Sequence, residues 1–389
     1  MRCQASHHFS IVQILQLSKF YPPVAGGIES VALELTTGLN ARGFRTDVLC
    51  AGLEFDTRIE NVDGYTIERA GSLGKLLSTS MSPALVLRFM KMRKRYDIVH
   101  VHLPNPMANL ALWLAGPSSR IVVHWHSDIV NQPAALRLYA PLQEWLLRRA
   151  DAIIATSAAY AEHSPWLRPH MAKVKVVPLG INRARTEQEI HKTESVARGI
   201  RHHYGERPLV FALGRMTSYK GFETLIESAG LMKHNAQVVV GGDGELLERH
   251  RRQVHSARLE HRIRFIGEMS SDDIHAHLAA ADVFCLPSRS RAEAFGVVLL
   301  EAMAAGLPIV ASDIVGSGVS WVNRDGETGS NVPVGNSAAL ALAIDSILGD
   351  PAKGRKMGEA GRRRLQDLFT ADQMVENTLG VYRDTCGQA

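Results

Sequence analysis

The sequence has little of what extracellular or membrane-spanning folds require. Its 389 residues include only four cysteines, Cys3, Cys50, Cys285 and Cys386, which lie far apart and have no CxxC or Cys/His ligand spacing. This argues against a zinc site or a disulfide framework and favours a reducing cytoplasm. The first ten residues contain charge and histidine, and the apolar run that follows, IVQILQL, is too short for a signal peptide or a bilayer span. We therefore expect a cytoplasmic chain.

Two functional motifs are also missing. No DxD triplet occurs, so a divalent cation bridging a diphosphate has no obvious ligand set, and we expect neither a metal nor a cofactor. No GxGxxG follows the first apolar run, which disfavours a dinucleotide-dependent dehydrogenase. The formal net charge is only +5, so local basic patches would have to meet any anionic partner, and we do not expect nucleic acid as one.

Short apolar runs rich in Val and Ile alternate with longer amphipathic segments, a pattern typical of parallel sheets connected through helices. We expect a first series of strands within residues 11–17, 45–51, 97–102, 120–126, 151–157 and 174–180, and a second series within 209–214, 236–242, 263–267, 282–288 and 307–313. The charged stretch between them, residues 181–208, reads as a linker plus one helix.

The two series predict an α/β protein with two Rossmann-like domains, whose parallel sheets face each other across a cleft. We expect an N-terminal domain over residues 1–188, a second domain over 189–370, and a C-terminal helix over 371–389 that packs back on the first domain. Ligands of such sheets bind at the carboxyl ends of the strands, so functional residues are expected in the loops that follow them.

The stretch SRSRAEAFGVVLLEAM, residues 288–303, carries two carboxylates at a predicted helix start. If the helix begins near Gly296, the free N–H groups of residues 296–298 form a donor cluster suited to a phosphate. Glu293 then precedes the helix, and Glu301 lies about 6 Å along its axis. Two isolated carboxylates are more often a helix start and a solvated face, so the function depends on their surroundings.

Basic residues lie in a second loop of the same half. In GRMTSYKGFETLIESA, Arg215 and Lys220 fall between a strand and a helix, where two cations could hold a diphosphate and stabilise it as a leaving group. The segment VVVGGDGELLERH adds another strand, glycine turn and helix. Either loop alone is weak evidence, because basic loop residues are usually solvated.

As an ordered set, the motifs GRMTSYKG, GGDGELLE, FIGEMS, ADVFCLPSRSRAEAFGVVLLEAMAAGLPIVASD and DGETG resemble the second domain of family 4 retaining glycosyltransferases, which have the glycosyltransferase B (GT-B) fold. The Glu, seven residues, Glu arrangement from Glu293 to Glu301 matches that family's signature. The resemblance extends over nearly the whole chain. It implies a nucleotide-sugar donor, a metal-independent site, retention of configuration, and a front-face displacement in which the leaving phosphate assists proton removal from the acceptor.

The resemblance also implies roles for individual residues. Arg215 and Lys220 would hold the donor diphosphate, Glu293 the hydroxyls of the transferred sugar, and Glu301 the ribose. In the second half, Phe265, Ile266 and Gly267 would lie against the base, and the amides of Phe295, Gly296, Val297 and Val298 against sugar and phosphate. In the first half, Gly26 and Gly27 would form a glycine loop near the diphosphate, His126 would contact the reacting sugar, and Asp128 would orient that sugar or the acceptor. We expect His100, His102 and His124 to be structural.

One departure from the family pattern bears on the donor sugar. The chain reads VGSGVSWVN, with Ser320 and Trp321, where many relatives have a glycine pair and then Pro-Glu. This resembles mannosyltransferases that build bacterial surface polysaccharides, so GDP-mannose is the expected donor. The alternatives are the same reaction with a UDP-sugar, or an inactive nucleotide-sugar-binding subunit of an assembly complex.

The acceptor would be a growing glycan, for which a polyprenyl diphosphate is one candidate carrier. The segment RFMKMRKRYD gathers Arg88, Lys91, Arg93, Lys94 and Arg95 beside apolar residues. Such a helix is suited to an anionic leaflet, which would place the protein at the cytoplasmic face of the inner membrane. A core-packed helix with a solvated basic end explains the segment equally well.

Overall fold

A computed structural model describes residues 12–24, 26–76, 79–129 and 133–387 of the chain. The predictions about the first ten residues and Cys3 lie outside this range. Two compact units are formed: unit 1 from the chain up to Ala155, Pro169–Lys175 and the segment from Val375 onward, and unit 2 from Thr156–Arg168 and Val176–Met374. The domain limits expected from the sequence stay a prediction. Among the described residues, no helix has both the length and the apolar character that crossing a bilayer requires.

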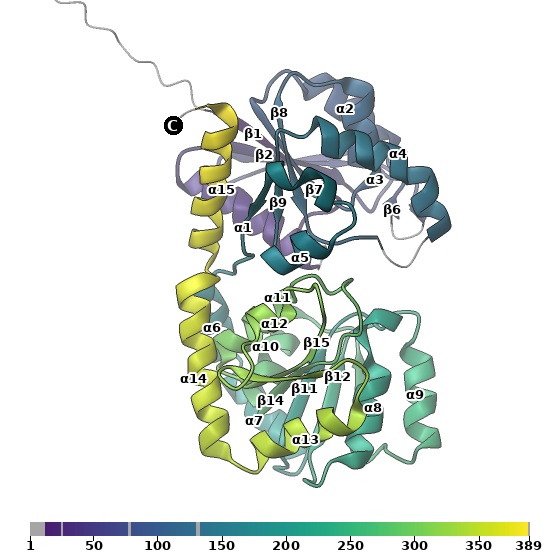
Figure 1. Cartoon of the computed structure of the whole chain (residues 1–389), viewed down its shortest axis with the longest axis vertical. Coiled ribbons are helices and arrows are strands. Elements are labelled where there is room, and N and C mark those ends of the chain that lie inside the picture. Colours follow the sequence, from purple (N-terminus) through teal and green to yellow (C-terminus); the bar gives the residue numbers. More distant parts are fainter. Residues whose placement is uncertain (1–11, 25, 77–78, 130–132, 388–389) are drawn as a thin grey trace, which may run out of the picture. The chain divides into compact units, whose positions relative to one another are not determined.

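The sheet of unit 1 is mostly parallel (Figure 1). Its strands, in spatial order, are β10 (Val174–Val176), β9 (Ala152–Ala155), β8 (Arg120–Trp125), β7 (Ile98–Leu103), β1 (Gln13–Leu17), β2 (Arg45–Ala51), β4 (Tyr65–Ala70) and β3 (Arg58–Val62). The edge strand β3 runs antiparallel to its neighbour β4. Strands β7 and β8 are buried along nearly their whole length, which agrees with the unbroken apolar character expected of strands covered on both faces.

Helices of unit 1 begin where the sequence offers capping residues. Ser82 and Asn105 accept hydrogen bonds from the third backbone N–H of helices α2 (Pro83–Met92) and α3 (Pro106–Ala115), and each of these helices has proline at its first position. The other helices of the unit are α1 (Gly27–Ala41), α4 (Pro133–Arg149) and most of α15 (Ala371–Cys386). Short elements complete it: β5 (Lys75–Leu76), β6 (Thr79–Ser80) and the 3-10 helix η1 (Arg168–Lys173).

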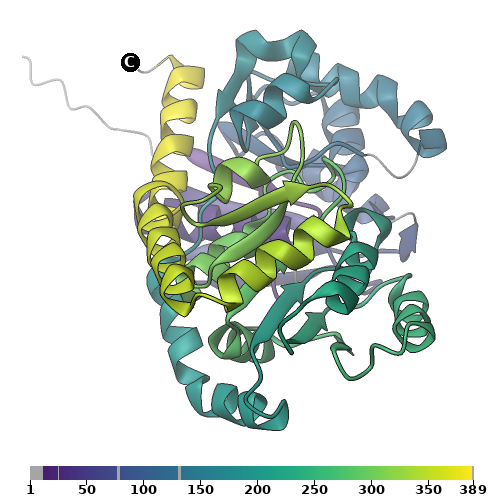
Figure 2. The ribbon, with the colours of Figure 1, turned by 60° about the horizontal axis from the view of Figure 1, so that its bottom comes forward.

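Unit 2 has a fully parallel sheet of six strands (Figure 2). Their spatial order is β13 (Ile263–Gly267), β12 (Gln237–Gly241), β11 (Leu209–Leu213), β14 (Val283–Leu286), β15 (Ile309–Asp313) and β16 (Gly329–Pro333). The helices are α5 (Ala158–His163), α6 (Arg183–Lys192), α7 (Glu194–His203), η2 (Ser218–Lys220), α8 (Phe222–Leu231), α9 (Leu247–Ser256), α10 (Ser271–Ala280), α11 (Val297–Ala305), α12 (Val319–Val322), α13 (Ser337–Leu348) and α14 (Pro351–Leu368).

A buried core joins helices α8 and α13 to this sheet. Phe222 and Leu225 of α8 and Ile344 of α13 lie in one cluster with Val238 and Val240 of β12, and none of the five is more than 1% exposed. Each fully buried aliphatic or aromatic side chain of this kind contributes about 1.5–3 kcal/mol to folding. This core fixes the strands whose carboxyl ends carry the candidate site.

Every apolar run that the sequence assigned to a strand forms one in the structure, and the expected fold class is confirmed. The linker prediction was wrong in part, because residues 181–208 form two helices, α6 and α7, in place of a linker with one. The basic helix is shorter than expected. It ends at Met92, so Arg93, Lys94 and Arg95 lie in the turn that follows.

Candidate functional site

The strand order of unit 2 reverses between β11 and β14, where chain connections leave in opposite directions. In parallel sheets such a switch point opens a crevice at the carboxyl ends of the two strands. The loop after β11 is tied here to the loop after β14, since the backbone N–H of Arg289 donates to the carbonyl of Tyr219 at 2.7 Å. At Gly221, where φ is +67°, an added Cβ would lie 2.2 Å from the carbonyl oxygen of Pro287. Only glycine fits this contact.

Lys220 and Glu293 meet at this switch point as a buried ion pair. The Nζ of Lys220 donates to Oε2 of Glu293 at 2.6 Å, and each side chain is only 10% exposed. The same carboxylate oxygen accepts a hydrogen bond from the hydroxyl of Ser288 at 2.9 Å, and Ser288 is completely buried. Sequence reasoning identified both charges but missed Ser288, which directly precedes the Glu-containing loop.

Lys220 keeps its proton despite burial. Burial by itself lowers the pKa of Lys220, but the carboxylate of Glu293 outweighs this effect, so the pKa is raised above its ordinary value. Arg215 lies in the same loop with its side chain exposed, and its positive charge acts to lower the pKa of Lys220. One buried cation and one exposed cation therefore share a single loop.

Glycines allow two loops to pack backbone against backbone beside this pair. An added Cβ at Gly242 would lie 2.1 Å from the carbonyl oxygen of Gly214, and one at Gly244 would lie 2.8 Å from that of Met216. The N–H of Met216 donates to Asp243 at 2.9 Å, which fixes the approach. Gly214 also leaves room for the Lys220 side chain, whose Cε would lie 3.0 Å from an added Cβ. The motif GGDG thus positions the cationic loop.

Helix α11 begins at Val297, directly after Gly296 in a left-handed conformation with φ of +79°. The first N–H groups of a helix have no acceptor within it, so the amides of residues 296–298 are available to an anion at the positive end of the helix dipole. Glu301 lies one turn further on, partly exposed, and burial raises the pKa of its carboxyl to about 7. The expected arrangement of Glu293, helix start and Glu301 is present in the structure.

The proposed base-contacting residues lie at the end of the edge strand β13. The ring of Phe265 turns toward the core, where it stacks on His250 at 5.5 Å between centroids, while Ile266 is 36% exposed. Gly267 has φ of +78°, and its carbonyl accepts a hydrogen bond from the N–H of Gly242 at 2.7 Å. A flat ligand could therefore meet Ile266 and backbone here, since one face of the Phe265 ring is taken up by His250.

The segment VGSGVSWVN, residues 315–323, packs against the loop that carries Glu293 and supports it. The N–H of Gly318 donates to the carbonyl of Ala294 at 2.7 Å, and the hydroxyl of Ser317 donates to the carbonyl of Glu293. Trp321 and Phe369 pack edge-on against the buried ring of Phe295, at 6.2 and 5.8 Å between centroids. Sequence reasoning noticed this segment only as a departure from a family pattern and missed its supporting role.

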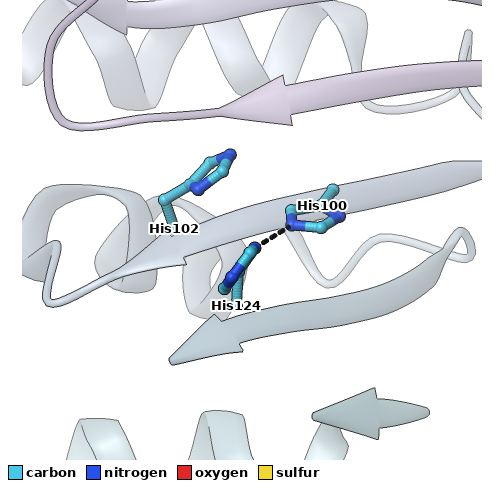
Figure 3. A group of neighbouring side chains, drawn as sticks. All are labelled: His100, His102 and His124. Atoms are coloured by element: carbon cyan, nitrogen blue, oxygen red, sulfur yellow. Dashed lines mark hydrogen bonds between the residues drawn. The ribbon is translucent and has the colours of Figure 1, made fainter. Parts of the chain in front are cut away.

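In unit 1, histidines gather where β7 and β8 run side by side (Figure 3). His100, His102 and His124 are completely buried, and each has a nitrogen within 4.8 Å of the others, so the group has a geometry in which metal ligands occur. The Nε2 of His100 lies 3.2 Å from Nδ1 of His124. Burial lowers the pKa of all three, that of His102 to about 3, and keeps the imidazoles neutral.

His126 follows β8 and extends this group, with 7% of the residue exposed. Its ring stacks on His124 at 4.2 Å between centroids, and its Nε2 lies 2.9 Å from Nδ1 of His102. Burial lowers its pKa well below the ordinary value, so it too is neutral. Asp128 accepts a hydrogen bond from the indole N–H of Trp125 at 3.0 Å.

Gly26 and Gly27 lie at the start of α1, after β1. Gly26 is the residue before the helix, and an added Cβ there would lie 2.1 Å from a carboxylate oxygen of Glu29. The predicted site residues thus form two groups. Arg215, Lys220, Glu293, Glu301 and the residues around Phe265 and Phe295 belong to unit 2, whereas Gly26, Gly27, His126 and Asp128 belong to unit 1.

The chain is similar in sequence and fold to known proteins. Residues 25–185 match the family described as Glycosyltransferase Family 4, and residues 195–364 match that described as Glycosyl transferases group 1. The chain is 31% identical over 372 residues to O-antigen chain mannosyltransferase C of Escherichia coli, covering 95% of this chain and 98% of that protein.

Two further proteins extend the comparison. D-rhamnosyltransferase WbpZ of Pseudomonas aeruginosa is 31% identical over 366 residues, covering 92% of this chain and 93% of that one. The solved structure of sucrose-phosphate synthase from Thermosynechococcus elongatus superimposes with a TM-score of 0.80 at 23% identity, covering 97% of this chain and 100% of that chain. The chain therefore belongs to glycosyltransferase family 4 and has the GT-B fold.

Proposed function

We propose that this glycosyltransferase transfers mannose from GDP-mannose to a glycan acceptor, with retention of configuration, in the synthesis of a surface polysaccharide. The observation that carries the donor site is the buried Lys220–Glu293 pair, which lies at the switch point of unit 2 just before the start of α11. The mannosyltransferase relative and the segment VGSGVSWVN support mannose as the sugar.

The leaving group of this reaction is a nucleoside diphosphate, whose negative charge grows as the glycosidic bond breaks. Lys220, Arg215 and the first amides of α11 are preorganised positive groups, and such groups stabilise developing charge most strongly where water is excluded. In this proposal Glu293 accepts hydrogen bonds from hexose hydroxyls, and Glu301 from ribose hydroxyls.

The residues of unit 1 would act on the sugar and the acceptor. In this proposal Gly26 and Gly27 approach the diphosphate through backbone, His126 contacts the reacting sugar, and Asp128 orients the sugar or acceptor. A front-face displacement, in which the leaving phosphate takes the acceptor proton, requires no enzyme nucleophile and no metal. The proposed location is the cytoplasm, at the inner membrane.

Two other functions are consistent with the same residues. A UDP-sugar would use the same cations and helix start, and the rhamnosyltransferase relative indicates that the sugar varies among similar chains. An inactive subunit would bind the donor without turnover. The intact Lys220–Glu293 pair and His126 favour an active enzyme over such a subunit.

A thermal-shift and turnover panel of nucleotides and nucleotide sugars tests the proposal. We expect GDP and GDP-mannose to stabilise the protein without added metal, since a ligand at 100 times its dissociation constant adds about 2.7 kcal/mol to the free energy of unfolding. Slow hydrolysis of GDP-mannose should accompany binding. A shift with UDP compounds alone would refute the GDP-mannose assignment, stabilisation that requires magnesium would refute the metal-free site, and binding without turnover would identify the inactive subunit.

The exposed surface of α2 and α3 supports the proposed membrane contact. Leu87 and Met90 of α2 are 60% and 37% exposed, and Trp113 and Leu114 of α3 are 52% and 50% exposed. The exposed basic residues Lys91, Lys94 and Arg95 lie on or directly after α2. By contrast, Arg88 forms an ion pair with Glu68, and Phe89 is buried. Apolar side chains with a basic border are the composition that binds anionic lipid surfaces.

Vesicle co-sedimentation tests this contact. Replacing Lys91, Lys94 and Arg95 with Gln should weaken binding to phosphatidylglycerol vesicles and flatten its salt dependence, because each basic residue contributes about 1 kcal/mol near such a surface. A matched control replaces Arg355, Lys356 and Arg363 of α14 with Gln. These three residues are exposed, and their replacement removes the same positive charge. Equal loss in both variants would argue for non-specific attraction and against this surface.

A further inference from the structure

Three neighbouring strands of unit 1 carry polar side chains on one face of the sheet. Alternate residues of a strand share a face, so His100 and His102 of β7 lie beside His124 and His126 at the end of β8. On the other side of β7, Gln16 of β1 pairs with His100 in register. All except His126 are completely buried. Polar side chains in such a place require hydrogen-bond partners.

One hydrogen-bonded row runs from Gln16 through His102 to His126. The amide oxygen of Gln16 lies 2.9 Å from Nε2 of His102, and Nδ1 of His102 lies 2.9 Å from Nε2 of His126. A neutral imidazole has one N–H donor and one acceptor nitrogen. With the amide oxygen as acceptor, His102 donates from Nε2 and accepts at Nδ1, so His126 donates from its own Nε2. That leaves Nδ1 of His126 unprotonated.

A second row joins the remaining polar groups, and its Tyr382 also has a side-chain contact with Gln16 of the first row. The hydroxyl of Tyr382 lies 2.6 Å from Nδ1 of His100, whose Nε2 contacts His124. All four ring nitrogens of His100 and His102 have hydrogen-bond partners, whereas Nε2 of His124 is buried without one. The second row supports the stacked rings but makes no hydrogen bond to His126 among the described residues.

We propose that Gln16 and His102 are positioning residues that fix the tautomer of His126, so that its Nδ1 is presented as a hydrogen-bond acceptor for a sugar hydroxyl. This rests on the proposed function, in which His126 contacts the reacting sugar. The nitrogen that meets a ligand is set by the bond that the other nitrogen makes. An unprotonated Nδ1 accepts a hydrogen bond from a sugar hydroxyl. It cannot donate a hydrogen bond to a sugar oxygen.

The tautomer is measurable in the ligand-free protein by 15N NMR of the histidine rings, which distinguishes a protonated nitrogen from an unprotonated one. The His126 signals are assigned as those lost in His126→Gln. We expect Nε2 of His126 to carry the proton in the parent protein. A protonated Nδ1 there overturns the proposal without any assay of activity.

The variant Gln16→Met tests the relay at a distance. It removes the acceptor for His102 Nε2–H, and a buried N–H without a partner is less tolerable than an unpaired acceptor, so both imidazoles should move their protons to Nδ1. His126 would then present a donor, and we expect kcat to fall about 10-fold, with the KM for the donor sugar within about 3-fold of the parent.

Gln143→Met is the matched control, because Gln143 of α4 is equally buried in the same unit but lies outside the row. It should leave both the tautomer and kcat unchanged. If Gln16→Met leaves the His126 tautomer and kcat as in the parent, the relay is wrong. A parent protein with the expected tautomer that transfers no sugar from any nucleotide sugar would overturn the proposed function and leave the tautomer assignment standing.

Discussion

The two units bury ionisable side chains in opposite ways at the carboxyl ends of similar sheets. In unit 2, Lys220 and Glu293 form a buried ion pair at 2.6 Å, and the carboxylate raises the pKa of Lys220 so that the lysine keeps its proton. In unit 1, four histidines lie together with no carboxylate in their hydrogen-bonded rows, and burial lowers the pKa of each so that none carries a charge near neutral pH.

The difference matches the ligands that the two groups are proposed to meet. A diphosphate is stabilised by fixed positive charge, which a buried lysine can supply only if a carboxylate holds its proton in place. A sugar hydroxyl is neutral, so it is best met by an oriented neutral hydrogen-bond partner. The same sheet architecture therefore supports a charged site in one unit and an uncharged one in the other.

The strongest test of the charged site is Lys220→Met. It leaves the carboxylate of Glu293 buried without a cation, and breaking a buried pair in this way costs about 3–5 kcal/mol of folding free energy. Chemical denaturation of the parent and the variant measures the loss. Turnover should fall to the background rate as well, because the cation for the leaving group is gone.

The double variant Lys220→Met with Glu293→Gln separates stability from catalysis. Removing both charges should recover most of the folding free energy, since no unpaired charge then remains buried, while turnover stays at background. A double variant as unstable as Lys220→Met alone would mean that the pair is not what holds this site together. Arg215→Gln serves as a control, because that side chain is exposed and its loss should leave stability unchanged.

The neutral, buried histidines of unit 1 should make the folded protein less stable in acid. The four histidines have a pKa near 6.5 in the unfolded chain and a lower one in the folded protein, so below pH 6.5 the unfolded chain binds protons that the folded chain does not. The free energy of unfolding should therefore decrease as the pH is lowered from 7.5 to 5.5, by about 1.4 kcal/mol for each histidine and about 5 kcal/mol in total. Denaturation at a series of pH values measures this slope.

A single substitution sharpens this second test. His124 has one ring nitrogen without a hydrogen-bond partner, so His124→Asn should still fold. The dependence of its unfolding free energy on pH should be smaller than that of the parent by about one proton. His202 of α7 is exposed, and His202→Asn should leave the slope unchanged. A parent protein equally stable at both pH values would contradict the neutral buried cluster.

A smaller effect distinguishes the two carboxylates of unit 2. Glu301 is proposed to contact the ribose, which does not change during reaction, so Glu301→Gln should raise the KM for the donor with little change in kcat. Glu293 is proposed to contact the hexose, so Glu293→Gln should lower kcat by about 10- to 150-fold, the equivalent of one charge-assisted hydrogen bond, and leave the affinity for GDP nearly intact. Loss of GDP binding in Glu293→Gln would reverse these assignments.

Glu301 also has a pH signature of its own. Its folded pKa of about 7 lies above the unfolded value, so its contribution to stability is present at low pH and is lost as the pH rises through 7. Glu301→Gln should therefore be about 1–3 kcal/mol more stable than the parent at pH 8.5 and little different at pH 5, as denaturation curves can measure.

Sequence periodicity predicted the central strands of both sheets because burial on two faces leaves long Val and Ile runs. It missed the β3–β4 hairpin, where Asp63 and Gly64 form the turn with positive φ, although an Asp-Gly pair between alternating residues is a recognised hairpin signal. The linker was misjudged for the opposite reason. Helix α6 buries none of its side chains and α7 buries only Ala197, so the few apolar residues, such as Val196 and Ile200 of α7, stand among charged ones in a short segment.

At the site, the sequence predicted the charged residues but not their supports. Lys220, Glu293 and Glu301 were recognisable from a spaced motif. Ser317 and Trp321 act through contacts with a loop more than twenty residues away, and Ser288, although only five residues from Glu293, belongs to no recognisable motif. The histidine row had a visible signal in HVH and HWH, two pairs with the period of a strand. The sequence does not reveal that strand β1 pairs with β7, and this pairing brings Gln16 beside His102.

The end of helix α15 sets an order for folding. Tyr382 lies near the end of the chain, yet its hydroxyl is the partner of His100 in the middle of unit 1, and the ring is almost completely buried. During synthesis, all of unit 2 emerges from the ribosome before this tyrosine does. The hydroxyl partner of His100 is therefore synthesised only after the whole of unit 2, although most residues of unit 1 are made first.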